Sequence, residues 1–190
     1  MSELPEMRAS HLKSNVESLA ELGAESDRAI RHAVADVVRT IEEASRVAWL
    51  PLELDVRLTE AVAEACGLEG TKRWSSGAIV RSADGPLLRP LIHGLQAMGL
   101  SPASALKRAP YAWGLIYRGC GELRFEPEGE HEIVLTQDDA PDAMLASPVY
   151  CEGIAGAFDG AVQIAGGRQP RSVVEIDTTL RCVRYRCRWD

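Results

Sequence analysis

The sequence of 190 residues lacks a long apolar run and an excess of positive charge. No stretch approaches the roughly 20 apolar residues that a bilayer-spanning helix needs. The net charge of −7 argues against nucleic acid or an anionic membrane surface as the main partner. Glu3, Pro5 and Glu6 are atypical of a signal peptide, so we expect a cytoplasmic protein without a membrane span.

Motifs of catalytic sites are also missing. The sequence contains no Gly-x-Ser-x-Gly elbow and no phosphate-binding P-loop. Asp138, Asp139 and Asp142 lie close together but lack the spacing and the glycine of an EF-hand, so we interpret them as an acidic loop. Because no convergent set of acid, base and nucleophile is visible, we expect the protein not to be an enzyme.

The five cysteines form no disulfide framework. Their number is odd and their spacing is not dense, which is typical of reduced thiols. They are Cys66, Cys120, Cys151, Cys182 and Cys187.

The first half of the chain has the apolar period of amphipathic helices. Ser10 and Gly23 suit the ends of the first helix, and Pro51 and Gly67 suit those of the third. Pro110 should kink or split the last one. We expect helices over residues 10–23, 26–43, 51–67, 71–82, 87–98 and 101–117, in a single domain of residues 8–190 that follows a flexible tail at residues 1–7.

The second half alternates polar and apolar residues, as half-buried strands do. Residues 122–126 and 131–135 predict a hairpin, and residues 172–178 and 181–189 predict two more strands. One helix, from Ser147 to Gly166, separates the two pairs. This β-β-α-β-β order predicts an α+β fold, in which the N-terminal helical half packs on a four-stranded antiparallel sheet.

The last predicted strand carries arginines at alternate positions, which therefore share one face of the sheet. They are Arg184, Arg186 and Arg188. Such a face usually pairs with acids on a neighbouring strand. The available acids are Glu122, Glu126, Glu132 and Glu175.

The helix between the strand pairs carries three glycines on one face, namely Gly153, Gly156 and Gly160. Each glycine costs about 1 kcal/mol relative to alanine inside a helix. The cost is reasonable if another segment packs very close to this face. Tyr150, Ile154, Phe158 and Val162 line a second face, and Glu152, Asp159 and Gln163 form a polar stripe.

Aromatic residues are the best candidates for a ligand pocket or a protein interface, because Trp and Tyr suit both. They lie in predicted helices or at helix ends that this fold would gather around one cavity or a dimer face. The alternative is plain core packing. The candidates are Trp49, Tyr111, Trp113, Tyr117 and Tyr150.

Short motifs over nearly the whole chain resemble a known superfamily. They are the helix at 10–23, Ala48-Trp49-Leu50-Pro51-Leu52, Ser101-Pro102, Arg118-Gly119-Cys120-Gly121, Cys151-x-Gly153-x-x-Gly156, Gly166-Gly167, residues 173–176, and Tyr185-Arg186-Cys187-Arg188-Trp189. The superfamily includes the 4-vinyl-reductase-type regulatory ligand-binding domain, the haem-NO-binding domain and the TRAPP vesicle-tethering subunits. The chain most resembles an uncharacterised paralogous family of similar length, best known from myxobacteria.

The resemblance implies an α+β ligand-binding fold that often dimerises through helices. In relatives, a hydrophobic cavity holds a phenolic effector, a haem or an acyl chain. The 4-vinyl-reductase-type domains often bind zinc through one cysteine before the Gly-rich helix and two in the final hairpin. Cys151 matches the first position, and Cys182 matches the third only roughly. Asp177, Thr178 and Thr179 stand where the second would fall.

Cys182 and Cys187 cannot replace the missing pair, because residues five apart on one strand point to opposite faces. We therefore predict buried free thiols and no metal, with Cys151 and Cys182 as the candidate ligands. The haem-binding relatives use a helix histidine and a Tyr-x-Ser-x-Arg motif. That motif is absent, and His93 is the candidate helix histidine, so we expect neither haem nor another cofactor.

Together these features predict a non-enzymatic sensory or scaffold module. It would bind a small apolar ligand, or a protein partner through its helical face, and a homodimer is expected. The alternative is a structural homodimer or assembly subunit whose cavity is filled and holds no ligand.

Overall fold

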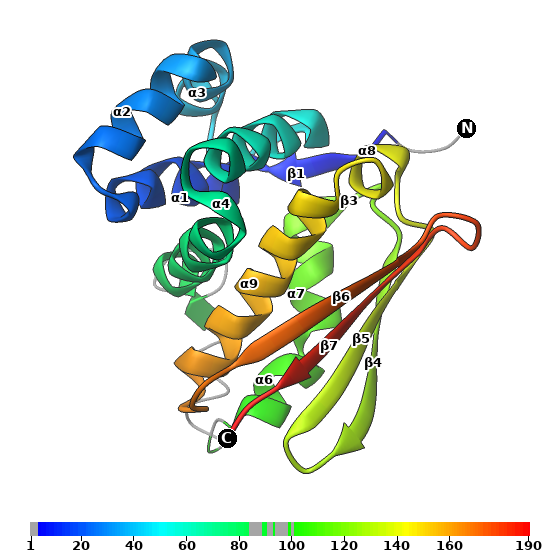
Figure 1. The fold of residues 1–190 in the computed structure, drawn as a ribbon. Helices are drawn as coiled ribbons and strands as arrows, with labels where there is room; N and C mark the ends of the chain where they lie inside the picture. Colours follow the sequence, from blue (N-terminus) through cyan, green and yellow to red (C-terminus); the bar gives the residue numbers. More distant parts are fainter. Residues whose placement is uncertain (1–3, 84–88, 91–92, 94–98, 100) are drawn as a thin grey trace.

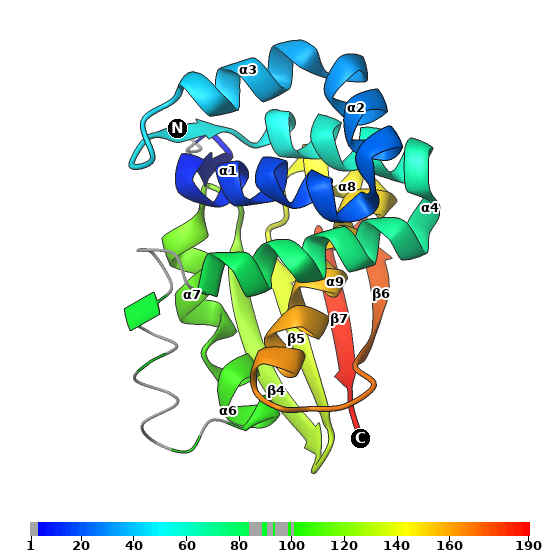
Figure 2. The same ribbon diagram turned by 90° about the vertical axis from the view of Figure 1, so that its left-hand side faces the viewer.

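The computed structural model describes residues 4–83, 89–90, 93, 99 and 101–190. A helical cap lies at one end of the molecule and a four-stranded sheet at the other (Figure 1). The cap consists of helices α1 (Ala9–Ser18), η1 (Leu19–Leu22), α2 (Ala24–Ala33) and α3 (Ala35–Glu43). Helices α4 (Leu52–Ala83) and α9 (Pro148–Ile164) lie between the cap and the sheet, as Figure 2 shows.

The four-stranded sheet has the order β4-β5-β7-β6, and every neighbouring pair is antiparallel. Its strands are β4 (Glu122–Gly129), β5 (Glu132–Asp138), β6 (Arg171–Asp177) and β7 (Cys182–Arg188). Short helix α8 (Asp142–Leu145) and α9 separate the two hairpins. The predicted α+β fold with a β-β-α-β-β second half is therefore confirmed.

A second, small sheet joins three distant parts of the chain in the order β2-β1-β3. Its strands are β1 (Glu6–Arg8), β2 (Trp49–Pro51) and β3 (Tyr117–Arg118). Met7 of β1 is only 1% exposed, and the carbonyl of Pro5 accepts a hydrogen bond from the Leu52 amide. Residues 5–7 therefore belong to the folded part of the chain and not to the tail expected at residues 1–7, because this segment supplies the central strand of a sheet.

Three predicted helices differ in their continuity. The helix expected at 26–43 is divided into α2 and α3 at Val34, whose φ of −123° and ψ of 42° are not helical. The two expected at 51–67 and 71–82 form α4, which bends at Gly67, where φ is 68°. The last is split into α6 (Pro102–Lys107) and α7 (Ala109–Ile116) next to Pro110, as expected. Most of the helix expected at 87–98 lies outside the described residues.

Two hydrophobic clusters lie on either side of α4. One joins the cap to α4 and includes Leu12, Val37, Leu58 and Trp74. The other joins α9 to the inner face of the sheet and includes Leu135, Tyr150, Ile154, Phe158, Val162 and Tyr185. Helix α4 contributes to both, since its Leu52 and Val56 belong to the second cluster. A movement of α4 would therefore disturb the packing of both layers.

The glycine face of α9 lies against the second part of α4, as close packing predicted. A Cβ added to Gly156 would lie 2.5 Å from the carbonyl oxygen of Lys72. One added to Gly160 would lie 2.7 Å from the carbonyl oxygen of Ser76. Both distances are too short for a carbon atom, so glycine is required for the two helices to approach this closely.

The outer face of the sheet pairs two of the three predicted arginines with one of the predicted acids, Glu132. Glu132 of β5 accepts hydrogen bonds of 2.8 Å from both Arg186 and Arg188 of β7. These hydrogen bonds lower the pKa of Glu132 to about 2, with Arg188 the larger cause. Arg186 also pairs with Glu128, an acid that the sequence did not single out. Among the described residues, we find no helix that combines the length and the apolar character needed to cross a membrane.

Candidate functional site

The structure brings three of the five candidate aromatic residues together. The rings of Trp113 and Tyr117 stack with their centroids 4.0 Å apart. The hydroxyl oxygens of Tyr117 and Tyr150 are 3.5 Å apart. Tyr111 instead lies on the outside of α7 and is 61% exposed. Whether these residues bind a ligand or a partner stays a prediction.

Trp49 lies elsewhere, in strand β2 of the small sheet. The guanidinium carbon of Arg8 lies 3.8 Å from the Trp49 ring centroid, and that of Arg118 lies 4.9 Å from it. Arg8 also donates a 2.7 Å hydrogen bond to the carbonyl of Val47. Trp49 thus links β2 to β1 and to β3 through cation–π contacts.

A buried polar cluster occupies the place where α1, α4 and α9 meet, and we call it the cap junction. Its members are His11, Asn15, Asp55, Tyr117 and Tyr150. Asp55 of α4 is 3% exposed. One of its carboxyl oxygens accepts a 2.8 Å hydrogen bond from the Asn15 amide of α1, and the other accepts a 2.9 Å hydrogen bond from the Tyr150 hydroxyl of α9. The carboxyl group therefore links the cap to α9 directly.

Burial shifts the pKa values of the cap junction. Burial raises the pKa of Asp55 to about 6, against the opposing effect of its hydrogen bonds from Asn15 and Tyr150. Burial lowers the pKa of His11 to about 4. The pKa values of Tyr117 and Tyr150 rise well above the ordinary value, chiefly through burial and secondly through the Asp55 charge. These shifts favour the neutral form of every ionisable side chain in the cluster.

A small, partly open cavity of about 20 Å³ lies within the cap junction. Side chains of the four ionisable residues line it, together with those of Asn15 and Thr59. A cavity this small and polar suits one water molecule, which needs about 10–15 Å³ and two to four polar partners.

Sequence reasoning missed the cap junction. Asp55 lies three residues before Leu58 and seven before Val62, so it occupies the buried stripe of its helix. A carboxyl group at such a position is rarely left without a partner. The position of Asp55 in this stripe was the signal from which a buried polar cluster could have been predicted.

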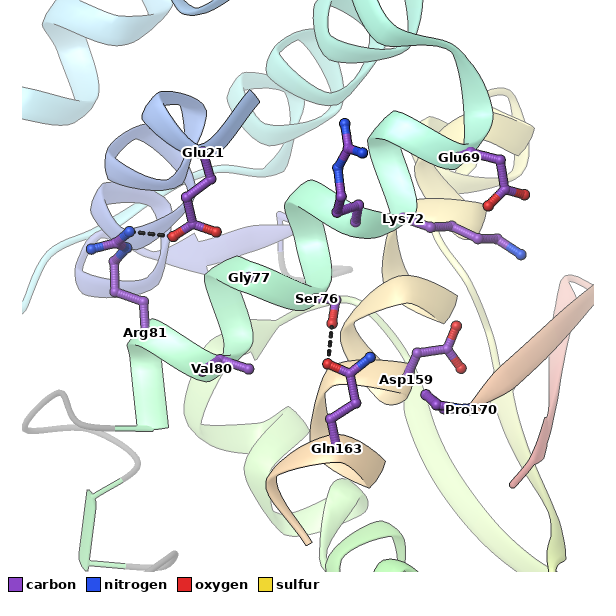
Figure 3. Close-up of a pocket in the computed structure, with 11 residues that line it drawn as sticks. Glu21, Glu69, Lys72, Ser76, Gly77, Val80, Arg81, Asp159, Gln163 and Pro170 are labelled. Carbon is purple, nitrogen blue, oxygen red and sulfur yellow. Dashed lines mark hydrogen bonds and ion pairs between the residues drawn. The ribbon is translucent and has the colours of Figure 1, made fainter. Parts of the chain in front are cut away.

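An open groove of about 690 Å³ runs along α4 and α9 (Figure 3). Asp159 and Gln163, two members of the predicted polar stripe of α9, line it. Gln163 accepts a 3.4 Å hydrogen bond from Ser76 of α4. Asp159 accepts a 2.6 Å hydrogen bond from Ser172, and burial raises its pKa. The other lining residues are Glu21, Glu69, Lys72, Arg73, Gly77, Val80, Arg81 and Pro170.

Side chains of both positive and negative charge line this groove. Lys72 lies 2.8 Å from Glu152, and Arg81 pairs with Glu21. Arg73 is exposed and forms no ion pair with any residue that the structure describes. The groove therefore suits a polar molecule or a polar peptide segment rather than an apolar one.

The candidate metal ligands are buried thiols. Cys151 is 0% exposed, and its thiol lies 3.5 Å from the carbonyl of Met144. Burial raises its pKa to about 12, so the thiol stays protonated near neutral pH. Burial also raises the pKa of Cys182. Within the described ranges, no group of three His, Cys, Asp or Glu side chains could hold a metal ion.

The fold is similar to that of several solved structures. One is an H-NOX protein from T. tengcongensis, with a TM-score of 0.65, 12% identity, and coverage of 97% of this chain and 98% of that chain. The chain has the H-NOX fold. An oxygen-binding H-NOX domain related to soluble guanylate cyclases gives a TM-score of 0.64 at 12% identity, with coverage of 97% and 95%. An H-NOX protein from K. algicida gives 0.62 at 9% identity, with coverage of 97% of both chains.

Sequence comparison gives less. No protein-family model matches the chain. An NAD kinase from Thermococcus sibiricus is 32% identical over 112 residues, which is 59% of this chain. The chain spans 38% of the length of that protein, and this partial similarity does not show family membership. Of the predicted resemblances, the haem-NO-binding fold is confirmed, whereas those to 4-vinyl-reductase-type domains, TRAPP subunits and the myxobacterial family stay predictions.

The comparison corrects our expectation of no cofactor. The similar structures are H-NOX proteins, one of them described with Fe(II) and another in work on haem distortion, so proteins with this fold do bind a cofactor. The expectation was wrong because it rested on a short motif. The fold follows instead from the burial pattern of the whole chain, which tolerates the loss of such a motif.

The residues that the structure describes do not themselves fit a haem. The cavity of about 20 Å³ in the cap junction is far below the roughly 300 Å³ at which ligand pockets begin. His11 lines it, but Nδ1 of this histidine is 3.2 Å from the Ser82 hydroxyl. The groove is large enough, yet none of the described residues that line it is a His, Cys or Met that could bind iron. His93, the predicted candidate, is helical and exposed.

Proposed function

We propose that the protein is a non-enzymatic sensory module. It takes up a small ligand in the groove along α4 and α9 and passes the signal to a protein partner or a second copy of the chain. The observation that carries this proposal is the position of α4, which forms one wall of the groove and belongs to both hydrophobic clusters. A ligand that favours one packing of α4 would shift the cap relative to the sheet.

The lining of the groove supports a polar ligand, in place of the apolar one expected from the sequence. Arg73 offers an exposed guanidinium group, and Asp159 and Gln163 offer acceptors and a donor on the opposite helix. The H-NOX fold supports the sensory role, and it makes haem the first cofactor to test. The comparisons give no support to the structural-homodimer alternative.

Native mass spectrometry of freshly purified protein, combined with hemin titration, tests the proposal. We expect one small molecule to be retained per chain, and we expect Gln163→Trp, which places a bulky ring in the groove, to weaken or abolish its retention. Glu126→Trp on the outer face of the sheet is the matched control and should leave retention unchanged.

Two outcomes would contradict the groove as the ligand site. A Soret band on hemin addition that Gln163→Trp leaves intact would place the ligand elsewhere in the chain. A chain that is purified empty and does not shift the Soret band of added hemin would contradict both the retained ligand and haem as that ligand.

A further inference from the structure

The cap junction buries one acid and one base around the same cavity. Asp55 is 3% exposed and His11 is 7% exposed, and both line the cavity of about 20 Å³. His11 belongs to α1 and Asp55 to α4, and the Tyr150 hydroxyl of α9 completes the cluster. Separation of α1 from α9 would therefore let water reach both ionisable groups at once.

Hydrogen bonds tie each of the two groups to a neighbouring element. The Asp55 carboxyl accepts from Asn15 of α1 at 2.8 Å and from Tyr150 of α9 at 2.9 Å. Nδ1 of His11 lies 3.2 Å from the hydroxyl of Ser82, near the end of α4. Opening of the cap breaks the bond between Asp55 and Asn15 and that between His11 and Ser82.

No opposite charge compensates either group in the described part of the structure. No Lys or Arg lines the cavity there. The other ionisable side chains that face it are Tyr117 of β3 and Tyr150 of α9, whose raised pKa values keep them neutral. The nearby thiols Cys120 and Cys151 have pKa values of about 12 and are neutral too. Burial without a counter-charge favours an uncharged acid and an uncharged base.

We propose that Asp55 and His11 are opposed proton-binding groups that keep the cap docked over a wide pH range. Opening returns each group to water and to its ordinary behaviour. Asp55 then releases the proton that it holds in the closed state, so opening becomes easier as pH rises from about 4 to 6. His11 takes up a proton on opening, so opening becomes harder as pH rises from about 4 to 6.5.

The two effects have opposite signs and nearly the same pH range. Each pKa unit corresponds to a factor of ten in the opening equilibrium, so each group alone contributes about a hundredfold change. The opening equilibrium constant, which contains the product of the two factors, changes by only a few-fold between about pH 4 and 7. The pair thus makes cap docking nearly independent of pH, and loss of either member makes it strongly dependent.

Hydrogen exchange of the α1 amides in the full chain tests this proposal, after correction for the pH dependence of intrinsic exchange. In the wild type, we expect the opening constant to vary by less than about tenfold between pH 4 and 7, as the cancellation requires. In Asp55→Asn, opening should become about a hundredfold harder as pH rises, because only His11 remains. In His11→Gln, it should become easier by a similar factor.

Two outcomes would overturn the proposal. One is that both variants follow the wild-type profile. The other is that both profiles slope in the same direction. If a variant fails to fold, NMR titration of the wild type still decides, because a His11 ring that titrates at its ordinary pKa contradicts the opposed pair. No ligand is present in these experiments, so their result is independent of the sensory role proposed above.

Discussion

Gly156 of α9 lies against the backbone of Lys72 in α4, so closely that a Cβ on Gly156 would meet the Lys72 carbonyl oxygen at 2.5 Å and its Cα at 2.7 Å. Backbone atoms cannot move aside as a flexible side chain can. Gly156→Ala should therefore destabilise the protein by about 1–3 kcal/mol, as overpacking does. This loss would outweigh the gain of about 1 kcal/mol in helix propensity.

Urea unfolding measures this effect, and Gly114→Ala provides the control. Gly114 lies in α7, and no described atom outside its own helix backbone and chain neighbours lies within 4 Å of its added Cβ. The control should be stabilised by about 0.5–1 kcal/mol, since alanine costs less backbone entropy than glycine. Equal effects of the two substitutions would show that the α4–α9 contact is looser than described.

The hydroxyl group of Tyr150 supports the buried Asp55 carboxyl. Tyr150→Phe removes a 2.9 Å hydrogen bond and leaves one carboxyl oxygen without that donor. We expect a loss of about 1–3 kcal/mol in the free energy of unfolding, and a further rise in the pKa of Asp55. Chemical denaturation measures the first change, and NMR titration of the carboxyl measures the second.

Tyr111→Phe is the matched control for that substitution. Tyr111 is 61% exposed, so removal of its hydroxyl should change the stability by less than about 0.5 kcal/mol. If Tyr150→Phe is as neutral as the control, the cap junction does not hold the cap in place.

The contact between Arg8 and Trp49 should contribute to the stability of the small sheet. A double-mutant cycle of Arg8→Met and Trp49→Leu isolates it, because each variant keeps much of the apolar volume. With the guanidinium carbon 3.8 Å from the ring centroid, we expect a coupling energy of about 0.5–1 kcal/mol. A coupling energy near zero would mean that the two side chains pack without a specific cation–π interaction.

The acid stability of the outer sheet should depend on Glu132. Its pKa is lowered from 4.5 to about 2 in the folded state, chiefly by the hydrogen bond from Arg188. The carboxylate therefore contributes stability above about pH 4.5, and this contribution is lost as pH falls toward 2. In Glu132→Gln, the decline of Tm over this range should be shallower than in the wild type.

Thermal unfolding in low and high salt provides the control for Glu132. Salt screens exposed ion pairs, so the difference between the wild type and Glu132→Gln should shrink in high salt. Glu126 lies on the same sheet face but forms no ion pair in the described structure. Glu126→Gln should therefore leave the decline of Tm at low pH unchanged. If the Tm of Glu132→Gln declines with falling pH as steeply as that of the wild type, the Glu132 carboxylate is not the source of the acid sensitivity.

Much of the fold could be predicted because it follows from local patterns. The alternation of polar and apolar residues in β7 indicates which face of the strand is buried. The spacing of the glycines in α9 indicates which face of the helix is closely packed. The pairing of Glu132 with Arg186 also followed from this alternation. In contrast, the cap junction depends on partners far apart in sequence, since Asn15 and Tyr150 lie 40 and 95 residues from Asp55. A local sequence pattern does not predict contacts between residues so far apart, so the sequence shows these residues only as ordinary polar positions.

The cofactor was mispredicted for a related reason. Sequence motifs report individual ligand contacts, whereas the arrangement of helices and strands depends on total burial. A chain can therefore keep the H-NOX arrangement at 12% identity while most of its side chains change. Haem is suggested by the arrangement of helices and strands alone. The residues described in the cavity and the groove do not by themselves form a haem site.

The small β2-β1-β3 sheet has a consequence for the order of folding. The hairpins β4-β5 and β6-β7 pair neighbouring segments, whereas β1 must pair Glu6 with Arg118, 112 residues away. Closing so long a loop is slower than forming a hairpin. We therefore expect the hairpins to form early and β1 to gain its second neighbour late. During synthesis, that strand must wait until residues 117–118 have left the ribosome.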